Sequence, residues 1–286
     1  MNNSSSLSIE IIKVKQDTSL KAFDLLASEE PMEIKIVFGR ATERIQKSIS
    51  VTMRTPGNDF ELAAGFLFTE GIIKNAGDIR AIKYCNGSNE NAVKIEMKDD
   101  IAIELNKLER NFYTTSSCGV CGKSSIDVIK TVCRLEDAEK DFTQISPEII
   151  YALPEILRSK QDVFGFTGGL HACGLFNYKG EFLLSREDVG RHNALDKLVG
   201  AALNQSMIPL RQNILLLSGR ASFELIQKAW MAGISVVAAI GAPSSLAVQM
   251  AEEAGITLIG FLRNRSFNIY TGSQIIISIY ENSSKG

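Results

Sequence analysis

The sequence lacks a long hydrophobic run and a strong charge of either sign. No apolar stretch approaches the roughly 20 residues that a helix needs to cross a bilayer. The N-terminus, MNNSSSLSIEIIKV, has neither the basic start nor the apolar run of a secretory signal. Because 31 Lys and Arg residues stand against 33 Asp and Glu residues, the formal charge is only -2. These absences predict a cytoplasmic protein that binds neither nucleic acid nor a membrane surface, so any basic site must be local.

Histidine and cysteine are also scarce. The chain has two histidines, His171 and His192, and five cysteines. An odd number of cysteines in a chain without an export signal does not predict a disulfide framework, because the cytoplasm keeps thiols reduced. The pattern assigns no role to Cys85, Cys133 or Cys173. The chain also lacks a G-x-G-x-x-G motif and a Walker lysine, which argues against ordinary use of NAD or ATP.

A length of 286 residues allows one large or two modest domains. The serine-rich residues 1–8 predict a disordered tail. We expect a smaller, β-rich α+β domain at 9–110, a mobile loop at 111–123 and an α/β domain with a mostly parallel sheet at 124–286.

Short β-like runs separated by Gly and Pro dominate the first part of the chain. The elements predicted there are strands at 32–37 and 48–53, a helix at 60–69 capped by Asp59, and a hairpin over 92–105. This order is typical of an antiparallel sheet with one helix.

The spacing of apolar residues changes in the second half of the chain. The first elements predicted there are a strand at 162–166, a hairpin of 171–176 with 181–185, and a helix at 189–203 opened by Asp188.

From Asn213 onward, apolar runs alternate with helical patterns. The predicted strands are 213–217, 234–240 and 256–262, with helices at 222–233 and 245–255 between them. Continuous runs of Ile, Val and Leu are typical of strands buried on both faces, and the helices have the length of right-handed crossovers. The pattern therefore predicts a β-α-β-α-β unit.

The sharpest local signal is the motif Cys118-Gly119-Val120-Cys121, in a small, polar segment before a predicted helix. Four interpretations remain open: a reactive nucleophile, part of a zinc site, a redox pair, or two structural residues. Reactivity is favoured because a helix N-terminus and Lys123 would stabilise a thiolate. Gly119 and Gly122 give the backbone freedom to swing a carried sulfur from donor to acceptor.

Two further segments combine glycine with titratable groups. Paired glycines precede His171, which allows a ligand to approach the backbone closely, although a histidine in a glycine-rich turn explains this segment equally well. Arg191 and His192 lie in the first turn of a predicted helix. An arginine is unfavourable for the helix dipole there, which indicates a ligand or a carboxylate partner.

Three loops follow the carboxyl ends of the predicted parallel strands. They are Ser218-Gly219-Arg220, Gly241-Ala242-Pro243-Ser244-Ser245 and Arg263-Asn264-Arg265-Ser266. The carboxyl ends of parallel strands meet at one sheet edge, where ligands of open α/β sheets bind. Helix N-termini and arginines suit phosphate, so this edge predicts an anionic, nucleotide-like ligand.

The same segments resemble a known family. The motifs are SSCGVCGK at 116–123, FTGGLHAC at 166–173, REDVGRHNALDK at 186–197, LSGRASFEL at 217–225 and RSFNIYT at 265–271. Together, in this order, they resemble the FdhD family, the formate dehydrogenase accessory sulfurtransferases. The likeness runs from about Arg54 to Thr271.

The resemblance implies a sulfur carrier that takes persulfide sulfur from a cysteine desulfurase. It would pass this sulfur to the molybdenum cofactor, Mo-bis(molybdopterin guanine dinucleotide), before the cofactor enters formate dehydrogenase. Cys118 would be the carrier with Cys121 beside it, and no catalytic metal is implied. We also expect a homodimer and a fold like that of cytidine deaminases, with three layers. The predicted cofactor-binding residues are Phe261, Leu262, Arg263, Asn264, Arg265, Ser266, Gly219, Arg220, His171, Arg191 and His192.

Two other functions are weighed against this one. The first is a zinc-bearing chaperone that binds the cofactor without covalent sulfur transfer. The second is hydrolytic deamination, which is disfavoured because His171 is followed by Ala-Cys rather than Ala-Glu, and because no proline precedes the cysteine pair.

Overall fold

A computed structural model describes residues 4–85, 91–99, 101 and 144–276 of the chain. These residues form two compact units, and both units are discontinuous in sequence. Unit 1 holds the described part of residues 1–121 together with Gln161–His171 and Glu187–Ser206. Unit 2 holds the described part of the remaining chain. The predicted boundary near residue 110 therefore differs from this division, because two later segments join the N-terminal part.

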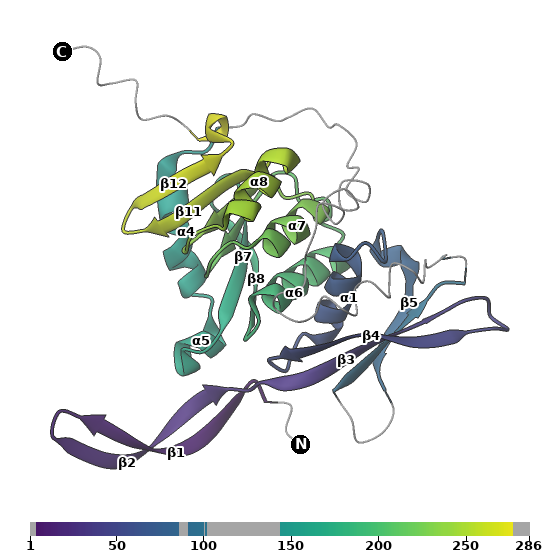
Figure 1. Cartoon of the computed structure of the whole chain (residues 1–286), viewed down its shortest axis with the longest axis horizontal. Coiled ribbons are helices and arrows are strands. Elements are labelled where there is room, and N and C mark those ends of the chain that lie inside the picture. Colours follow the sequence, from purple (N-terminus) through teal and green to yellow (C-terminus); the bar gives the residue numbers. More distant parts are fainter. Residues whose placement is uncertain (1–3, 86–90, 100, 102–143, 277–286) are drawn as a thin grey trace. The chain divides into compact units, whose positions relative to one another are not determined.

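Unit 1 contains a four-stranded sheet with the order β4-β3-β6-β5 (Figure 1). Its strands are β3 (Glu30–Phe38), β4 (Ile45–Arg54), β5 (Ile79–Tyr84) and β6 (Ala92–Met97). β3 pairs with β4 antiparallel and with β6 parallel, and β5 pairs with β6 antiparallel. Met32, Ile34 and Ile36 are fully or almost fully buried, as expected of alternate residues on one face of a strand. The predicted strands at 32–37 and 48–53 are confirmed.

The predicted hairpin over 92–105 is not the pairing that β6 makes. β6 pairs with β5, which precedes it, and with β3, while residues 102–105 lie outside the described part of the chain. Sequence alternation predicts a strand, but it does not identify the partner strand.

Two helices of unit 1 cross at glycines. They are α1 (Asp59–Thr69) and α6 (Arg191–Asn204). A Cβ atom on Gly65 would lie 1.8 Å from the carbonyl oxygen of Asp196, and one on Gly200 would lie 1.9 Å from that of Glu61. The two backbones are therefore in direct contact, and no other residue fits at either position.

The N-terminal strands β1 (Ser6–Lys15) and β2 (Thr18–Ala27) form a separate antiparallel sheet of two strands (Figure 1). The predicted tail 1–8 is wrong for residues 6–8, since β1 begins at Ser6. The physical reason is that backbone pairing with β2 supplies order that the serine-rich composition alone does not predict.

The short helix α5 (Asp162–Thr167) also belongs to unit 1 and corrects the predicted strand at 162–166. The carboxylate of Glu187 accepts hydrogen bonds from the backbone N–H groups of Val163 (3.1 Å) and Phe164 (2.9 Å). It therefore supplies the partners that the first turn of a helix lacks. This carboxylate comes from a distant part of the chain, so no local pattern indicated it.

Unit 2 is built on a six-stranded sheet with the order β12-β11-β10-β9-β7-β8. Its strands are β7 (His171–Asn177), β8 (Phe182–Asp188), β9 (Asn213–Leu217), β10 (Val236–Ala239), β11 (Thr257–Arg263) and β12 (Ser266–Thr271). Its helices are α4 (Pro147–Arg158), α7 (Phe223–Met231) and α8 (Ser245–Ala254). β9, β10 and β11 are parallel, while β7 and β12 join them antiparallel, so the sheet is mixed rather than mostly parallel. The added antiparallel strands belong to hairpins, which return the chain directly beside the parallel strands.

The core of unit 2 is apolar. Ile214, Leu216 and Ile259 of the sheet belong to one cluster with Leu153 and Leu157 of α4, and all five are at most 1 % exposed. All four residues of β10 are buried, as predicted for a strand covered on both faces. The predicted order β9-α7-β10-α8-β11 is confirmed. Within the described residues, no helix is long and apolar enough to span a membrane.

Candidate functional site

In unit 2, the ends of β9, β10 and β11 meet through backbone hydrogen bonds. The N–H of Gly241 donates to the carbonyl of Gly219 (3.0 Å), and the N–H of Phe261 donates to the carbonyl of Gly241 (3.1 Å). A Cβ atom on Gly241 would lie 2.9 Å from Cγ of Arg220. The three loops predicted to share one sheet edge therefore do so, and Gly241 lets them approach.

The turn from β11 to β12 has an unusual backbone. Phe261, Asn264 and Arg265 have positive φ angles of 54°, 52° and 53°. Asparagine adopts this region readily, whereas a bulky phenylalanine rarely does, and such strained residues gather at binding sites. The pairing register also shifts between Gly260 and Arg263, as in a β-bulge. A bulge re-aims side chains, and here the ring of Phe261 remains 37 % exposed.

Five residues of this turn line an open cavity of about 410 Å³. They are Phe261, Arg263, Asn264, Ser266 and Asn268. The guanidinium carbon of Arg263 lies 5.9 Å from the centre of the Phe261 ring. The cavity thus offers one aromatic face, one cation and two amide side chains, which suits a ligand with a planar ring and an anionic group.

Two residues of the predicted segment do not line the cavity. Leu262 is 1 % exposed and belongs to the apolar core, because side chains alternate along β11. Arg265 instead pairs with Oε2 of Glu148 (2.5 Å), and its guanidinium lies 5.2 Å from the centre of the Tyr151 ring. The side chains of this ion pair are 69 % and 65 % exposed, so it contributes only about 0–1 kcal/mol. A ligand anion therefore competes for Arg265 at little cost.

Three other predicted residues lie in unit 1. His171 precedes the part of β7 that belongs to unit 2, and Arg191 and His192 open α6. Burial lowers the pKa of His171, and the positive charge of Arg191 lowers it further. Both effects favour the neutral form of the imidazole. The predicted cofactor-binding residues thus divide between the two units.

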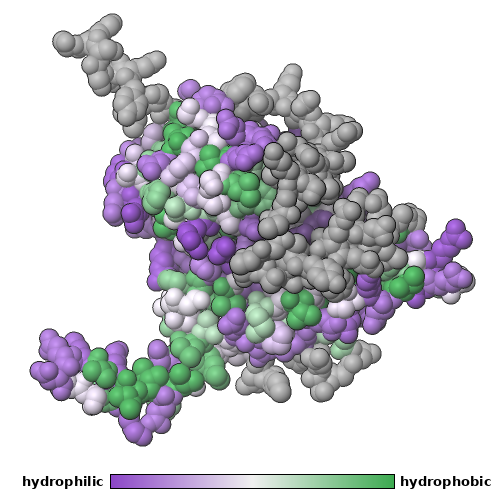
Figure 2. All heavy atoms as spheres, viewed as in Figure 1, coloured by the Kyte–Doolittle hydropathy of each residue, from purple (hydrophilic) through white to green (hydrophobic). Residues whose placement is uncertain are grey.

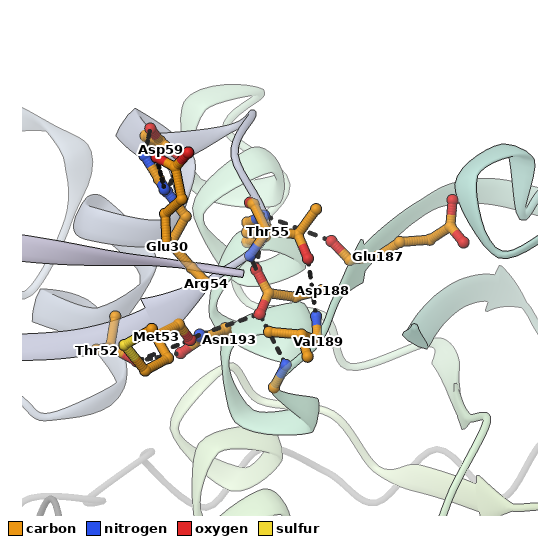
Figure 3. Close-up of polar contacts among 12 residues, drawn as sticks. Glu30, Thr52, Met53, Arg54, Thr55, Asp59, Glu187, Asp188, Val189 and Asn193 are labelled. Atoms are coloured by element: carbon orange, nitrogen blue, oxygen red, sulfur yellow. Dashed lines mark hydrogen bonds and ion pairs between the residues drawn. The ribbon is translucent and has the colours of Figure 1, made fainter. Parts of the chain in front are cut away.

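Beside Arg191, unit 1 contains a buried polar network that the sequence analysis missed (Figure 3). The Asp188 carboxylate accepts hydrogen bonds from the backbone of Thr55 (3.1 Å) and Gly190 (2.8 Å), and from Nδ2 of Asn193 (3.1 Å). It also pairs with Nζ of Lys197 at 2.7 Å, and both side chains are at most 2 % exposed. Gly190 lies in the loop after β8, and Asn193 and Lys197 lie in α6, so these contacts hold in place the backbone of the turn that Arg191 opens.

The network continues into the segment before α1. Arg54 donates from Nε (3.1 Å) and Nη2 (3.0 Å) to the carboxylate of Asp59, and both side chains are 0 % exposed. Nδ2 of Asn193 donates to the carbonyl of Met53 (2.7 Å). Residues 52–59 are therefore joined to residues 187–197. One available signal was the pair Asp196 and Lys197 in an otherwise apolar stretch of α6.

Cys118 and Cys121 lie outside the described residues, so their predicted role stays a prediction. Two other cysteines lie in the described ranges: Cys85 is half-buried, and Cys173 is buried in β7. In the described ranges, no group of three or more His, Cys, Asp or Glu side chains is arranged to hold a metal ion.

Comparisons with known proteins cover most of the chain. The model of the FdhD/NarQ family matches residues 28–277. A protein named sulfur carrier protein FdhD from Streptomyces coelicolor is 48 % identical over 270 residues, which are 92 % of this chain and 93 % of the relative. A protein of the same name from Mycolicibacterium paratuberculosis is 52 % identical over 255 residues, 87 % of this chain and 90 % of the relative.

One solved structure shares the fold. A crystal structure of a protein assigned as a formate dehydrogenase accessory protein, from Desulfotalea psychrophila, aligns with a TM-score of 0.72 and 22 % identity. The alignment covers 96 % of this chain and 100 % of that one. Together with the family match over residues 28–277, these findings show that the chain belongs to the FdhD/NarQ family.

Proposed function

We propose that this chain is a sulfur carrier in the maturation of formate dehydrogenase. It would receive sulfur from a cysteine desulfurase as a persulfide on Cys118 and pass it to the molybdenum cofactor, Mo-bis(molybdopterin guanine dinucleotide). The relatives named sulfur carrier protein support the role in sulfur transfer. The structural observation that carries the proposal is the cavity formed by Phe261, Arg263 and their neighbours, which suits a nucleotide.

Sulfur transfer to and from Cys118 can be written so that atoms and electrons balance. The Cys118 thiolate attacks the outer sulfur of the desulfurase persulfide, an S–S bond forms, and the desulfurase cysteine leaves as a thiolate. In the second step the Cys121 thiolate attacks the inner sulfur of the Cys118 persulfide. The products are a Cys118–Cys121 disulfide and HS⁻ for the cofactor. A cellular dithiol then reduces the disulfide with two electrons.

The cavity on unit 2 would hold the guanine-nucleotide end of the cofactor. Its volume of about 410 Å³ is near the lower end of the range of roughly 300–1,000 Å³ for small-molecule sites. It therefore suits one end of the cofactor rather than the whole. Phe261 would stack on the base, and Arg263 would pair with a phosphate. Arg265 would exchange Glu148 for a second phosphate contact.

The proposal also includes a compartment and a finer fold assignment. A carrier thiol needs a reducing compartment, which favours the cytoplasm. The helices around the mixed sheet of unit 2 are consistent with a three-layer arrangement like that of cytidine deaminases.

Mass spectrometry of the intact protein tests the carrier step. After incubation with a cysteine desulfurase and cysteine, we expect the mass to rise by one sulfur atom, with loss of the addition on treatment with a dithiol reductant. Cys118→Ser should abolish the addition, and Cys85→Ser, which changes another accessible thiol, should not. Addition that persists in Cys118→Ser would contradict the proposal. Zinc in equal amount to protein, lost in Cys121→Ser, would favour the zinc-bearing chaperone instead.

Calorimetric titration with a guanine nucleotide tests the cavity. We expect Arg263→Ala and Arg265→Ala each to weaken binding by roughly tenfold or more, since a charge-assisted hydrogen bond contributes about 1.5–3 kcal/mol. Arg211→Ala changes an exposed arginine of the same unit and should leave the affinity unchanged. Persulfide loading should be normal in all three variants. Unchanged affinity in the first two would remove the assigned site.

A further inference from the structure

The outer face of the four-stranded sheet in unit 1 carries a row of lysines. Lys35 of β3 pairs in register with Lys94 of β6, and Lys94 pairs with Lys83 of β5. Directly paired residues point to the same face of a sheet and lie about 5 Å apart. The next pair along β3 and β6, Ile36 with Ile95, is fully buried and faces the core. Because side chains alternate along a strand, the three lysines face outward.

This row has too few carboxylates to neutralise it. Like charges directly opposite each other destabilise a sheet, and Lys94 has one on each side. Lys35 pairs with Glu33 at 3.0 Å, and Lys83 pairs with Oε1 of Glu96 at 2.7 Å. The ammonium group of Lys94 lies 3.7 Å from the same oxygen of Glu96. Three cations therefore share two acids, and the central lysine has the weakest partner.

A second group of charges beside the row has the same shortage. One carboxylate, that of Asp99, pairs with both Arg44 (2.6 Å) and Arg80 (2.8 Å). The two groups adjoin, because the pKa of Glu96 is lowered mainly by its hydrogen bond from Lys83 and also by the charge of Arg44. Together the five cations meet three carboxylates. This face thus has a surplus of two positive charges, on a chain whose formal charge is -2.

The same face also exposes apolar side chains. Exposed apolar surface in unit 1 is not confined to the β1–β2 hairpin, along which Figure 2 shows apolar residues gathered. Val51 of β4 pairs in register with Glu33, so it lies on the outer face beside the lysine row, and it is 59 % exposed. Met53, two residues further along β4, lies on the same face and is 47 % exposed. An apolar strip bordered by charge is typical of a protein interface.

The mixture of charges indicates a protein partner. Glu33 and Glu96 flank the lysine row and would repel the phosphates of a nucleic acid or of an anionic lipid surface. A protein surface can instead place carboxylates against the surplus cations and an apolar side chain against Val51. Such complementarity increases the rate of encounter and excludes other partners. The partner that fits this face therefore presents an acidic segment with an apolar side chain beside it.

We infer that the outer face of this sheet docks the sulfur donor, a cysteine desulfurase that presents an acidic surface segment. This inference rests on the proposed function, in which the chain meets both a donor and an acceptor. The cavity on unit 2 is the proposed place of the acceptor's cofactor, so the surplus charge on unit 1 is assigned to the donor. The face then contributes to binding of the desulfurase and not to the chemistry at Cys118.

The kinetics of persulfide loading test the charged part of the face. With a catalytic amount of desulfurase and excess cysteine, mass spectrometry of the full chain at increasing concentration gives KM and kcat for sulfur addition. Lys83→Gln with Lys94→Gln should raise KM roughly tenfold and change kcat by less than about twofold, since charges at an interface act mainly on association. The matched control, Lys160→Gln with Lys179→Gln, removes two exposed lysines of unit 2 and should leave KM unchanged.

A pair of substitutions on one strand tests the apolar part. Val51→Asp puts an acid on the outer face and should also raise KM roughly tenfold. Ile45→Asp is the control, because Ile45 of β4 is 52 % exposed but pairs with the buried Phe38 and so points to the opposite face. It should leave KM unchanged. An equal rise in both variants would overturn the assignment of the outer face.

Two further measurements separate this inference from the proposed function. A small donor, glutathione persulfide, should load every variant at the same rate, and a slower rate for Lys83→Gln with Lys94→Gln would mean that the substitutions act on Cys118 itself. Biolayer interferometry with the desulfurase should show roughly tenfold weaker binding for the same variant, whether or not sulfur is transferred. Unchanged binding and KM would overturn the inference and leave the proposed function intact. Binding without any sulfur addition to the unaltered chain would instead contradict the proposed function.

Discussion

The two units differ in where they place their polar groups. Of the buried polar and charged residues in the described chain, ten lie in unit 1 and two in unit 2. Unit 1 buries complete ion pairs such as Asp188 with Lys197, whereas unit 2 buries an apolar core and exposes Arg263 and Arg265 at the ends of its strands. The comparison indicates two uses of charge. In unit 1 charge joins distant segments in one geometry, and in unit 2 it remains accessible to a ligand.

Among the tests of this difference between the units, Asp188→Ala should have the largest effect on stability. The substitution leaves the ammonium group of Lys197 buried without its carboxylate, which costs about 3–5 kcal/mol of unfolding free energy. Urea denaturation monitored by circular dichroism measures it. Glu252→Ala removes an exposed acid of α8 in unit 2 and should change stability by less than about 0.5 kcal/mol. Equal losses in the two variants would show that the buried network is not the source of the difference.

Gly65→Ala should have the next largest effect, because it separates the helices that carry the network. A Cβ atom at this position would meet the backbone of Asp196 at 1.8 Å, so we expect a loss of about 2–3 kcal/mol. Gly165→Ala is the matched control, since nothing lies within 4 Å of a Cβ atom there and α5 would gain up to about 1 kcal/mol from a better helix former. Thermal denaturation of both variants, which should shift in opposite directions, checks this expectation.

Glu148→Gln tests whether the exposed charge of unit 2 is available to a ligand. The exposed pair with Arg265 contributes about 0.2–1 kcal/mol, so its loss should raise the affinity for a guanine nucleotide by up to about fivefold without loss of stability. The same titration with Glu252→Gln, which removes a distant charge of the same sign, should show no gain. A fall in affinity for Glu148→Gln would mean that Glu148 itself contacts the ligand.

The smallest expected effect concerns pH and unit 1. Burial and Arg191 hold the pKa of His171 below its ordinary value of 6.5, so the folded state disfavours the protonated form. The resulting contribution to stability is fully present above pH 6.5 and is lost as the pH falls through the lower pKa of the folded state. Urea denaturation at pH 7.5 and pH 5.5 should show a smaller loss for His171→Gln than for the unaltered chain. An equal loss would assign the pH dependence to other groups.

Much of unit 2 was predictable from sequence. The strands β9, β10 and β11 and the helices between them follow from apolar runs of matching length. Their parallel order follows from crossover connections, so the meeting of three strand ends at one edge was also predictable. The orientation of single side chains was less predictable. Leu262 lies in the core, and Arg265 forms an ion pair with Glu148.

Unit 1 was predicted less well, because its order depends on partners far apart in the chain. The sequence predicted a strand where α5 lies, because aromatic and β-branched residues favour strands locally. The helix is capped by the carboxylate of Glu187, which is distant in sequence. The sequence predicted that Asp188 begins the helix α6. Its carboxylate instead accepts a hydrogen bond from the backbone of Thr55 and pairs with Lys197.

By itself, the sequence determined which segments form most strands and helices, which glycine-bounded loops follow the parallel strands, and which family the chain belongs to. Only the tertiary structure decided which strand pairs with β6, how the ends of the mixed sheet are made, and which buried charges meet. The reason is that apolar periodicity acts over a few residues, whereas a buried charge is stable only beside its partner. That partner can stand anywhere along the chain.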